Sequence, residues 1–266
     1  MRLARPDPDR GIMLDMNSVS ATVGVVLSHG FTGSLAAVAP WAEALRAEGF
    51  RVVTPLLPGH GTTWGDLARR SWHEWYDAFE SAYLELSEEC TVVAAGGLSM
   101  GGALALRLAA LHPVAAVTVV NPALVVDDPR SHLSGVMRYA LRSVPAIGND
   151  IKRPGQDEQA YDRTPVAAAH QLKLLFRDTV QLLPRVTAPL QVFRSAVDHV
   201  VTSERSVGAI TRSYGGSDLR FVRLPDSYHV ATLDNDADSI FTRSAAFIRD
   251  VTASAVTRTE HTEEHA

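Results

Sequence analysis

The chain has 266 residues, of which 46% are hydrophobic and 21% are charged, close to the averages of globular domains. Its formal net charge of −5 argues against a nucleic-acid partner, which would need a basic face, and gives no attraction to an anionic membrane surface. The one cysteine, Cys90, excludes an internal disulfide framework and a cysteine-based zinc site. We expect Cys90 to be a half-buried thiol in front of a strand.

The first residues lack the apolar core of a signal peptide, and no stretch approaches the ~20 apolar residues of a membrane span. We therefore expect a cytoplasmic protein.

Short runs rich in Val, Leu and Ala predict buried parallel strands. The predicted strands are 23–28, 51–54, 91–96, 116–121, 190–194 and 220–224. Helical patterns lie between most of them, at 37–48, 72–87, 100–110 and 239–251. This alternation predicts one α/β domain over residues 1–266, with a mostly parallel central sheet flanked by helices.

The alternation stops between about residues 124 and 183, where we find no convincing strand. The segment has a helical stretch over 134–142, then several Pro and Gly residues, then another helix. We predict a helical cap inserted within the domain, which either covers a site or is an ordinary pair of surface helices. Residues 252–266 have little to bury, so we expect a disordered tail or a helix end that frays into one.

The strongest chemical signal is Gly97-Leu98-Ser99-Met100-Gly101-Gly102, directly after a predicted strand and directly before a predicted helix. A serine at such a sharp turn has its hydroxyl lifted clear of the sheet, and the neighbouring glycines avoid clashes with the strand and the helix. The helix N-terminus beneath it favours negative charge on a substrate oxygen. Ser99 is therefore the predicted nucleophile.

A serine nucleophile needs a base, which in turn is oriented by an acid. Only His229 follows a late strand through a short loop and precedes the final helix, so it is the predicted base. Asp198 is the first carboxylate beyond the strand 190–194 and is the predicted acid, ahead of Asp226 and Asp234. The other candidate histidines are His112, His132, His170 and His199.

A glycine loop, His29-Gly30-Phe31-Thr32-Gly33, ends the first strand. In this arrangement the backbone N–H groups of Phe31 and Met100 are predicted to form the oxyanion hole. We expect His29 to brace the loop and Gly59-His60-Gly61 to be a second structural turn. No histidine pair has metal-ligand spacing, and the glycine loop lacks a dinucleotide fingerprint, so neither a metal nor a cofactor is expected.

These motifs resemble those of the bacterial monoacylglycerol lipases and the small thermostable carboxylesterases, which have the α/β-hydrolase fold. The likeness covers nearly the whole chain and includes Asp198-His199-Val200-Val201 and the segment 227–234. It implies hydrolysis of a monoacylglycerol that enters through an apolar cap tunnel. By the same resemblance, Ile147 lines that tunnel and Glu158 helps to hold the glycerol end.

Several alternatives stay open at this point. A general short- or medium-chain carboxylesterase or a thioesterase has the same fold and nucleophile. An epoxide hydrolase or haloalkane dehalogenase is disfavoured, because the resemblance gives those families an Asp where this chain has Ser99. A non-catalytic small-molecule receptor on a hydrolase scaffold is the non-enzymatic alternative. The expected partner is a lipid or ester substrate, with transient membrane contact through the cap, and the chain is expected to be a monomer or homodimer.

Overall fold

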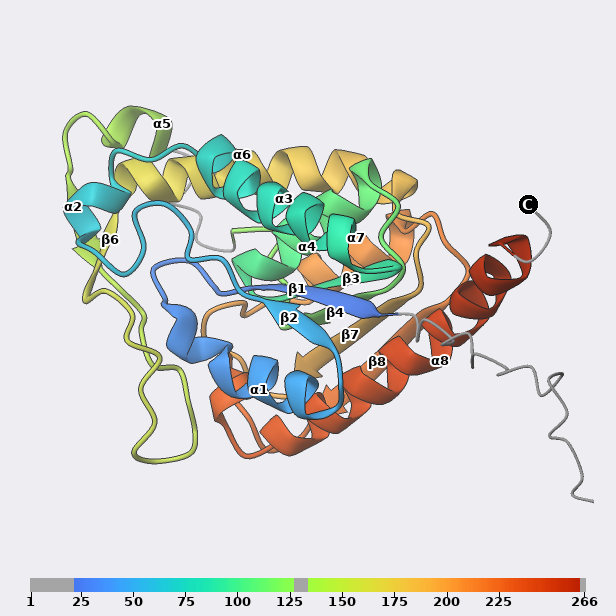
Figure 1. Ribbon diagram of the computed structural model, residues 1–266. Helices are drawn as coiled ribbons and strands as arrows, with labels where there is room; N and C mark the ends of the chain where they lie inside the picture. The colour runs from blue at the N-terminus through green and yellow to red at the C-terminus, as the bar shows by residue number, and fades with distance from the viewer. Residues whose placement is uncertain (1–21, 127–133, 264–266) are drawn as a thin grey trace, which may run out of the picture.

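A computed structural model of the chain describes residues 22–126 and 134–263. Its centre is a six-stranded sheet in the order β2-β1-β3-β4-β7-β8, and every neighbouring pair is parallel (Figure 1). The strands are β1 (Val23–Ser28), β2 (Arg51–Val53), β3 (Val92–Leu98), β4 (Val117–Val120), β7 (Leu190–Ser195) and β8 (Leu219–Leu224). The predicted α/β fold with a parallel sheet is confirmed.

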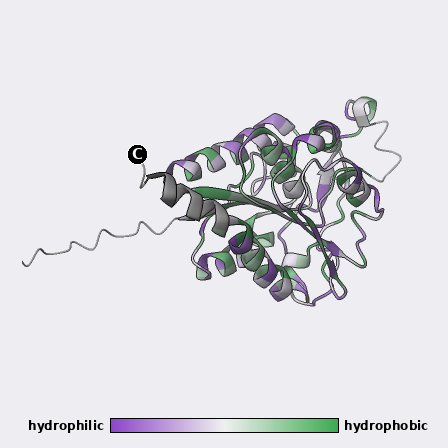
Figure 2. Cartoon of the chain, turned by 90° about the vertical axis from the view of Figure 1, so that its right-hand side faces the viewer, coloured by the Kyte–Doolittle hydropathy of each residue, from purple (hydrophilic) through white to green (hydrophobic). Residues whose placement is uncertain are grey.

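Helices cover both faces of the sheet. In Figure 1, α1 (Ala39–Ala47) and α8 (Ala237–Glu263) lie below it, while α3 (Trp72–Glu89), α4 (Met100–Leu111) and α6 (Val166–Leu182) lie above it. Each layer encloses its own apolar cluster, with Trp41 at 0% exposure in one and Trp75 at 0% in the other. Figure 2 shows hydrophobic residues concentrated in the central strands. Burial on both faces explains why these strands lack polar alternation.

Some short elements escaped sequence analysis. They are α2 (Trp64–Leu67), α7 (Arg205–Ser213), and the 3₁₀ turns η1 (Leu35–Ala37), η3 (Leu183–Arg185) and η4 (Ala231–Leu233). The helix predicted over 37–48 begins two residues later, because Ala37 ends η1 and α1 starts at Ala39. Ser71 begins α3 with a capping box, in which its hydroxyl accepts from Glu74 N and the Glu74 carboxylate accepts from Ser71 N.

The inserted segment differs from its prediction. It contains a two-stranded antiparallel hairpin, β5 (Ser143–Pro145) with β6 (Arg163–Pro165), where no strand was expected. Each strand has only three residues and a proline at its end, which is too short for a visible pattern. The stretch predicted as helix over 134–142 is helical only in α5 (Ser134–Met137). α6 packs against α3 and α4, so it belongs to the upper helical layer.

The C-terminal end of the chain is also more ordered than a disordered tail would be. The final helix α8 extends to Glu263, so of the two forms expected for the segment from residue 252 the structure has the helix end over 252–263, and 264–266 lie outside the described residues. His132 lies outside them as well. Within 22–126 and 134–263, none of the helices combines the length and the apolar composition that crossing a membrane would require. Over the same ranges, no three His, Cys, Asp or Glu side chains gather where they could hold a metal ion.

Candidate active site

Ser99 occupies a strained turn between β3 and α4. Its backbone has φ 56° and ψ −115°, a conformation that costs free energy for a residue other than glycine. The turn fits only because its neighbours lack side chains. A Cβ on Gly97 would lie 2.3 Å from the carbonyl carbon of Gly101, and one on Gly101 would lie 2.2 Å from the carbonyl oxygen of Ser28. The glycine spacing read from the sequence therefore has a steric cause.

Ser99 is held at the carboxyl end of the sheet. Its N–H donates to the carbonyl of Val120 at the end of β4, and its own carbonyl accepts from the N–H of Ala123. The side chain is nearly buried, and the residue is 8% exposed. The nucleophile candidate is thus fixed against the segment that follows β4.

His229 and Asp198 lie in contact, as their order in the sequence predicts. Nδ1 of His229 is 3.0 Å from Oδ2 of Asp198, and the side chains are 7% and 0% exposed respectively. His229 lies in the loop after β8, and Asp198 lies in the loop after β7. Because Nδ1 faces the carboxylate, the opposite ring nitrogen Nε2 is the one left for exchange of a proton with another group.

The Asp198 carboxylate is held by a set of donors. Oδ1 accepts from the backbone N–H groups of Val200 and Val201, at 2.9 and 2.7 Å, and Oδ2 also accepts from Arg194 at 2.6 Å. Burial by itself would raise the pKa of Asp198. The hydrogen bond and charge of His229, the Val201 N–H and the Arg194 guanidinium outweigh it, and the pKa lies below its ordinary value. The carboxylate is therefore ionised at neutral pH.

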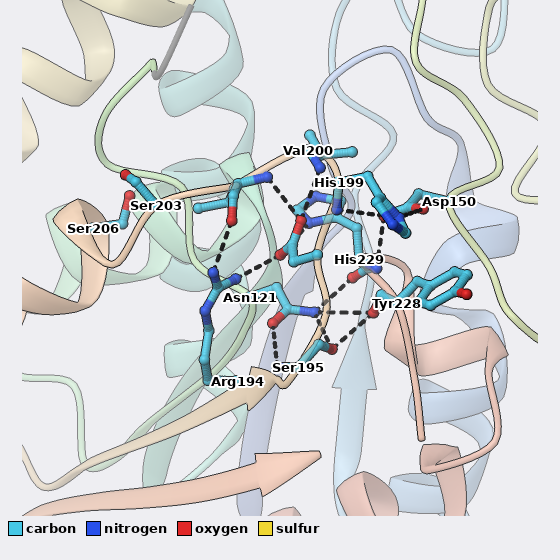
Figure 3. Close-up of polar contacts among 12 residues, drawn as sticks. Asn121, Asp150, Arg194, Ser195, His199, Val200, Ser203, Ser206, Tyr228 and His229 are labelled. Atoms are coloured by element: carbon cyan, nitrogen blue, oxygen red, sulfur yellow. Dashed lines mark hydrogen bonds and ion pairs between the residues drawn. The ribbon is translucent and has the colours of Figure 1, made fainter. Parts of the chain in front are cut away.

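Asn121 holds the loop of His229 from below, a role that sequence analysis missed. It directly follows β4 with a left-handed φ of 43°, and its Nδ2 donates to the carbonyl of His229 at 2.8 Å. The same side chain bonds Ser195 at the end of β7, through the Ser195 N–H and hydroxyl (Figure 3). The only sequence signal was an Asn at a strand end, where Asn tolerates a left-handed backbone. Asn121 directly follows Val120, whose carbonyl accepts from the Ser99 N–H. It thus connects the segment that holds Ser99 to the loop of the base candidate.

The predicted oxyanion loop lies against the nucleophile candidate. A Cβ on Gly30 would be 3.5 Å from Cβ of Ser99, so the residue before Phe31 lies against the nucleophile candidate. Met100 is the first residue of α4, and the first N–H groups of a helix have no intrahelical acceptor. Met100 is therefore next to Ser99 in the chain, and the loop that carries Phe31 approaches Ser99 in space; that their N–H groups form the oxyanion hole stays a prediction.

His29 braces this loop, as expected. Its Nδ1 donates to the carbonyl of Gly30 at 2.9 Å, while Nε2 accepts from the N–H of Leu57 at 3.2 Å. Burial lowers the pKa of His29 to about 4, so the ring is neutral. His60 stands 4.8 Å from it between ring centroids, in the turn where Gly59 and Gly61 have positive φ. Burial and the neighbouring His29 lower the pKa of His60 to about 3.

Of the two cap residues singled out, one is buried beside the glycine loop and one lies on the surface. Glu158 is 8% exposed, and its Oε2 would be 3.4 Å from a Cβ on Gly33 in the glycine loop. Burial raises the pKa of Glu158, although the N–H of Asn149 and the charge of His229 act in the opposite direction. Ile147 is 65% exposed. Its predicted place along a tunnel stays a prediction.

Comparisons with known proteins agree with this architecture. The model of the alpha/beta hydrolase family matches residues 25–250. The thermostable monoacylglycerol lipase of Bacillus sp. (strain H-257) is 38% identical over 226 residues, which cover 85% of this chain and 90% of that protein. The carboxylesterase of Bacillus subtilis (strain 168) is 26% identical over 217 residues, 81% of this chain and 88% of that protein.

A solved structure from work on LipS and LipT, two metagenome-derived lipolytic enzymes, has a TM-score of 0.83 to this chain. It is 39% identical and the match covers 88% of this chain and 96% of that one. A family match over most of the chain, together with these identities, leads to one conclusion: the chain belongs to the alpha/beta hydrolase family.

Proposed function

We propose that the protein hydrolyses a monoacylglycerol to glycerol and a free fatty acid through an acyl-enzyme on Ser99. The chain belongs to the alpha/beta hydrolase family and is 38% identical to a monoacylglycerol lipase over 85% of its length. These two findings make it a carboxylic ester hydrolase. The observation that carries the mechanism is the contact of His229 Nδ1 with Asp198 Oδ2, at the same end of the sheet as Ser99.

In the first half-reaction, Nε2 of His229 takes the proton of the Ser99 hydroxyl while Oγ attacks the ester carbonyl carbon. The negative charge moves to the carbonyl oxygen, which accepts from the N–H groups of Phe31 and Met100. The Asp198 carboxylate stabilises the imidazolium that forms and keeps Nδ1 protonated. When the C–O bond breaks, His229 returns its proton to the leaving alcohol, and the acyl group stays on Ser99.

In the second half-reaction, His229 takes a proton from water while the hydroxide attacks the acyl carbon. The same two N–H groups hold the second tetrahedral intermediate. Collapse breaks the bond to Oγ, His229 returns the proton to Ser99, and the fatty acid leaves. Each proton lost is returned, so the enzyme ends as it began.

The cap supports a small polar alcohol as the leaving group. Glu158 places a buried carboxyl group beside the glycine loop, and a carboxyl group suits the hydroxyls of glycerol better than the apolar chain. A general carboxylesterase or a thioesterase would use the same Ser99 chemistry without needing this group.

The cap also exposes apolar side chains, which we propose meet lipid aggregates transiently. Val136, Tyr139 and Ile147 are 75%, 81% and 65% exposed. Part of the protein should sediment together with neutral phosphatidylcholine vesicles, and Ile147→Ser should reduce the fraction that sediments with them. Equal sedimented fractions of the wild type and the Ile147→Ser variant would contradict this contact.

The test of the function compares purified protein on mono-, di- and triacylglycerols and on p-nitrophenyl esters and thioesters. We expect the highest kcat/KM on monoacylglycerol, labelling of the protein by a fluorophosphonate, and loss of both in Ser99→Ala. Turnover of that variant should fall by about 10⁴-fold or more. Near-normal turnover in Ser99→Ala would refute the nucleophile, and a higher kcat/KM on thioesters would replace the proposed substrate class.

A further inference from the structure

Asp150 enters the site from the inserted segment and contacts the loops of both Asp198 and His229. Its Oδ2 accepts from the N–H of His199 at 3.0 Å and from the N–H of His229 at 3.1 Å (Figure 3). His199 directly follows Asp198. The side chain of Asp150 is only 9% exposed, so the carboxylate itself is largely shielded from water.

The two backbone N–H groups converge on a single oxygen atom. That atom therefore bridges the loop after β7 and the loop after β8, which carry Asp198 and His229 and bring them within 3.0 Å of each other. The other oxygen, Oδ1, lies 2.7 Å from Nδ1 of His199, and the His199 ring meets Tyr228 edge-on at 4.7 Å. Asp150 thus bonds both loops through their backbone N–H groups, which stay in place when the His199 or His229 side chain rotates.

Further bonds keep Asp150 itself in place. Its carbonyl accepts from the N–H of Val230, the residue after His229. In return, the fully buried Asp234 of the histidine loop accepts from the N–H groups of Lys152 and Arg153, at 2.7 and 2.9 Å. The segment 150–153 and the histidine loop are therefore bonded in both directions. At this end the insertion is anchored to the catalytic loop.

We propose that Asp150 is a positioning residue for the hydrolysis, acting through the backbone of His229 and of His199. This inference rests on the proposed function. The His229 N–H is held by Asp150, its carbonyl by Asn121 and its ring by Asp198, so the loss of one support lets the ring move. A displacement of about 1 Å at a reacting group costs on the order of 10²-fold in rate.

The experiment compares Asp150→Ala, Asp150→Asn and Asp150→Glu with wild type. The concentration of active sites is titrated with a fluorophosphonate, and kcat, KM and the second-order rate of labelling are measured per active site. In Asp150→Ala, kcat and the labelling rate should fall together by about 10²-fold, with KM changed less than about threefold. Asp150→Asn should stay within about tenfold of wild type, because its amide oxygen accepts both N–H groups.

Asp150→Glu keeps the charge but is longer by one methylene, so it should push the loops apart and be slower than Asp150→Asn. This comparison still decides the question if Asp150→Ala does not fold. The control is Asp162→Ala, an exposed cap aspartate that should behave as wild type.

Unchanged kcat and labelling in Asp150→Ala, a change in KM alone, or a Glu variant faster than the Asn variant would each overturn the proposal. Labelling needs no particular ester. A wild type that labels at Ser99 but leaves monoacylglycerol intact would therefore count against the proposed function alone.

Discussion

Arg194 donates from Nη1 to Oδ2 of Asp198 at 2.6 Å, the same oxygen that faces His229. Its Nη2 donates to the carbonyl of Val201, which fixes the guanidinium in the loop after β7. Arg194 lies in the strand itself, four residues before Asp198. The acid candidate is therefore a buried carboxylate with both a cation and a base on one oxygen.

Replacing Arg194 by Met should destabilise the protein by about 3 kcal/mol, because it leaves a buried carboxylate without its cation. The pKa of Asp198 should rise, so the rate relative to wild type should fall further as the pH is lowered. Urea unfolding at neutral pH and a pH–rate profile measure the two effects. Arg223→Met, at an exposed position on β8, is the control. Equal effects of the two changes would contradict the role of Arg194 as the cation that holds the Asp198 carboxylate.

Asp198→Asn should lower kcat by about 10⁴-fold, because an amide cannot stabilise the imidazolium or hold its tautomer. Asp226, a competitor on sequence grounds, instead pairs with Lys152 at the surface, where the two side chains are 57% and 43% exposed. Exposed pairs contribute little, so Asp226→Asn should have near-normal kcat. Steady-state kinetics of both variants on one ester decide the matter, and a severe loss in Asp226→Asn would exchange the two roles.

Gly101→Ala should destabilise the protein by at least about 3 kcal/mol, because its methyl group meets backbone atoms of Ser28 that cannot rotate away. The fraction of active sites titrated by a fluorophosphonate should fall as well. Gly65→Ala is a matched control in α2, since the nearest atom to its Cβ is 3.7 Å away. Thermal unfolding of both variants is the measurement, and similar melting temperatures would show that the elbow can absorb a side chain.

Acid should destabilise the protein through its buried histidines. Burial lowers the pKa of His60 from 6.5 to about 3. Below about pH 6.5, the unfolded chain therefore binds a proton at His60 that the folded protein does not bind. The free energy of unfolding should therefore fall as the pH decreases through this window, by at most about 1.4 kcal/mol per pH unit for each such proton. His29 acts in the same direction, with a pKa of about 4.

His60→Phe keeps an aromatic ring at this position but removes the group that binds one of these protons. Urea unfolding at pH 8, where the histidine is neutral in both states, measures the packing effect of the change alone. Between pH 6.5 and 4 the variant should lose stability less steeply than wild type. Parallel curves over that range would contradict this account of His60.

Local chain geometry made Ser99, the parallel strands and the order of the candidate residues predictable. A glycine-flanked elbow and a run of buried β residues are properties of neighbouring positions, so they leave a pattern in the sequence. Strand ends were placed within one or two residues for the same reason. The hairpin of β5 and β6 was missed, because three-residue strands have no period to detect.

The supports of His229 were decided by the tertiary structure alone. Asn121 and Asp150 are 108 and 79 residues away from it in the chain, and their bonds go to backbone groups that every residue possesses. Such a contact needs no particular residue type at position 229 and therefore leaves no motif. The order of strands and loops in the chain determined that Ser99, Asp198 and His229 lie at the carboxyl edge of the sheet. Only the tertiary structure placed Asp150 of the insertion against the backbone of His229.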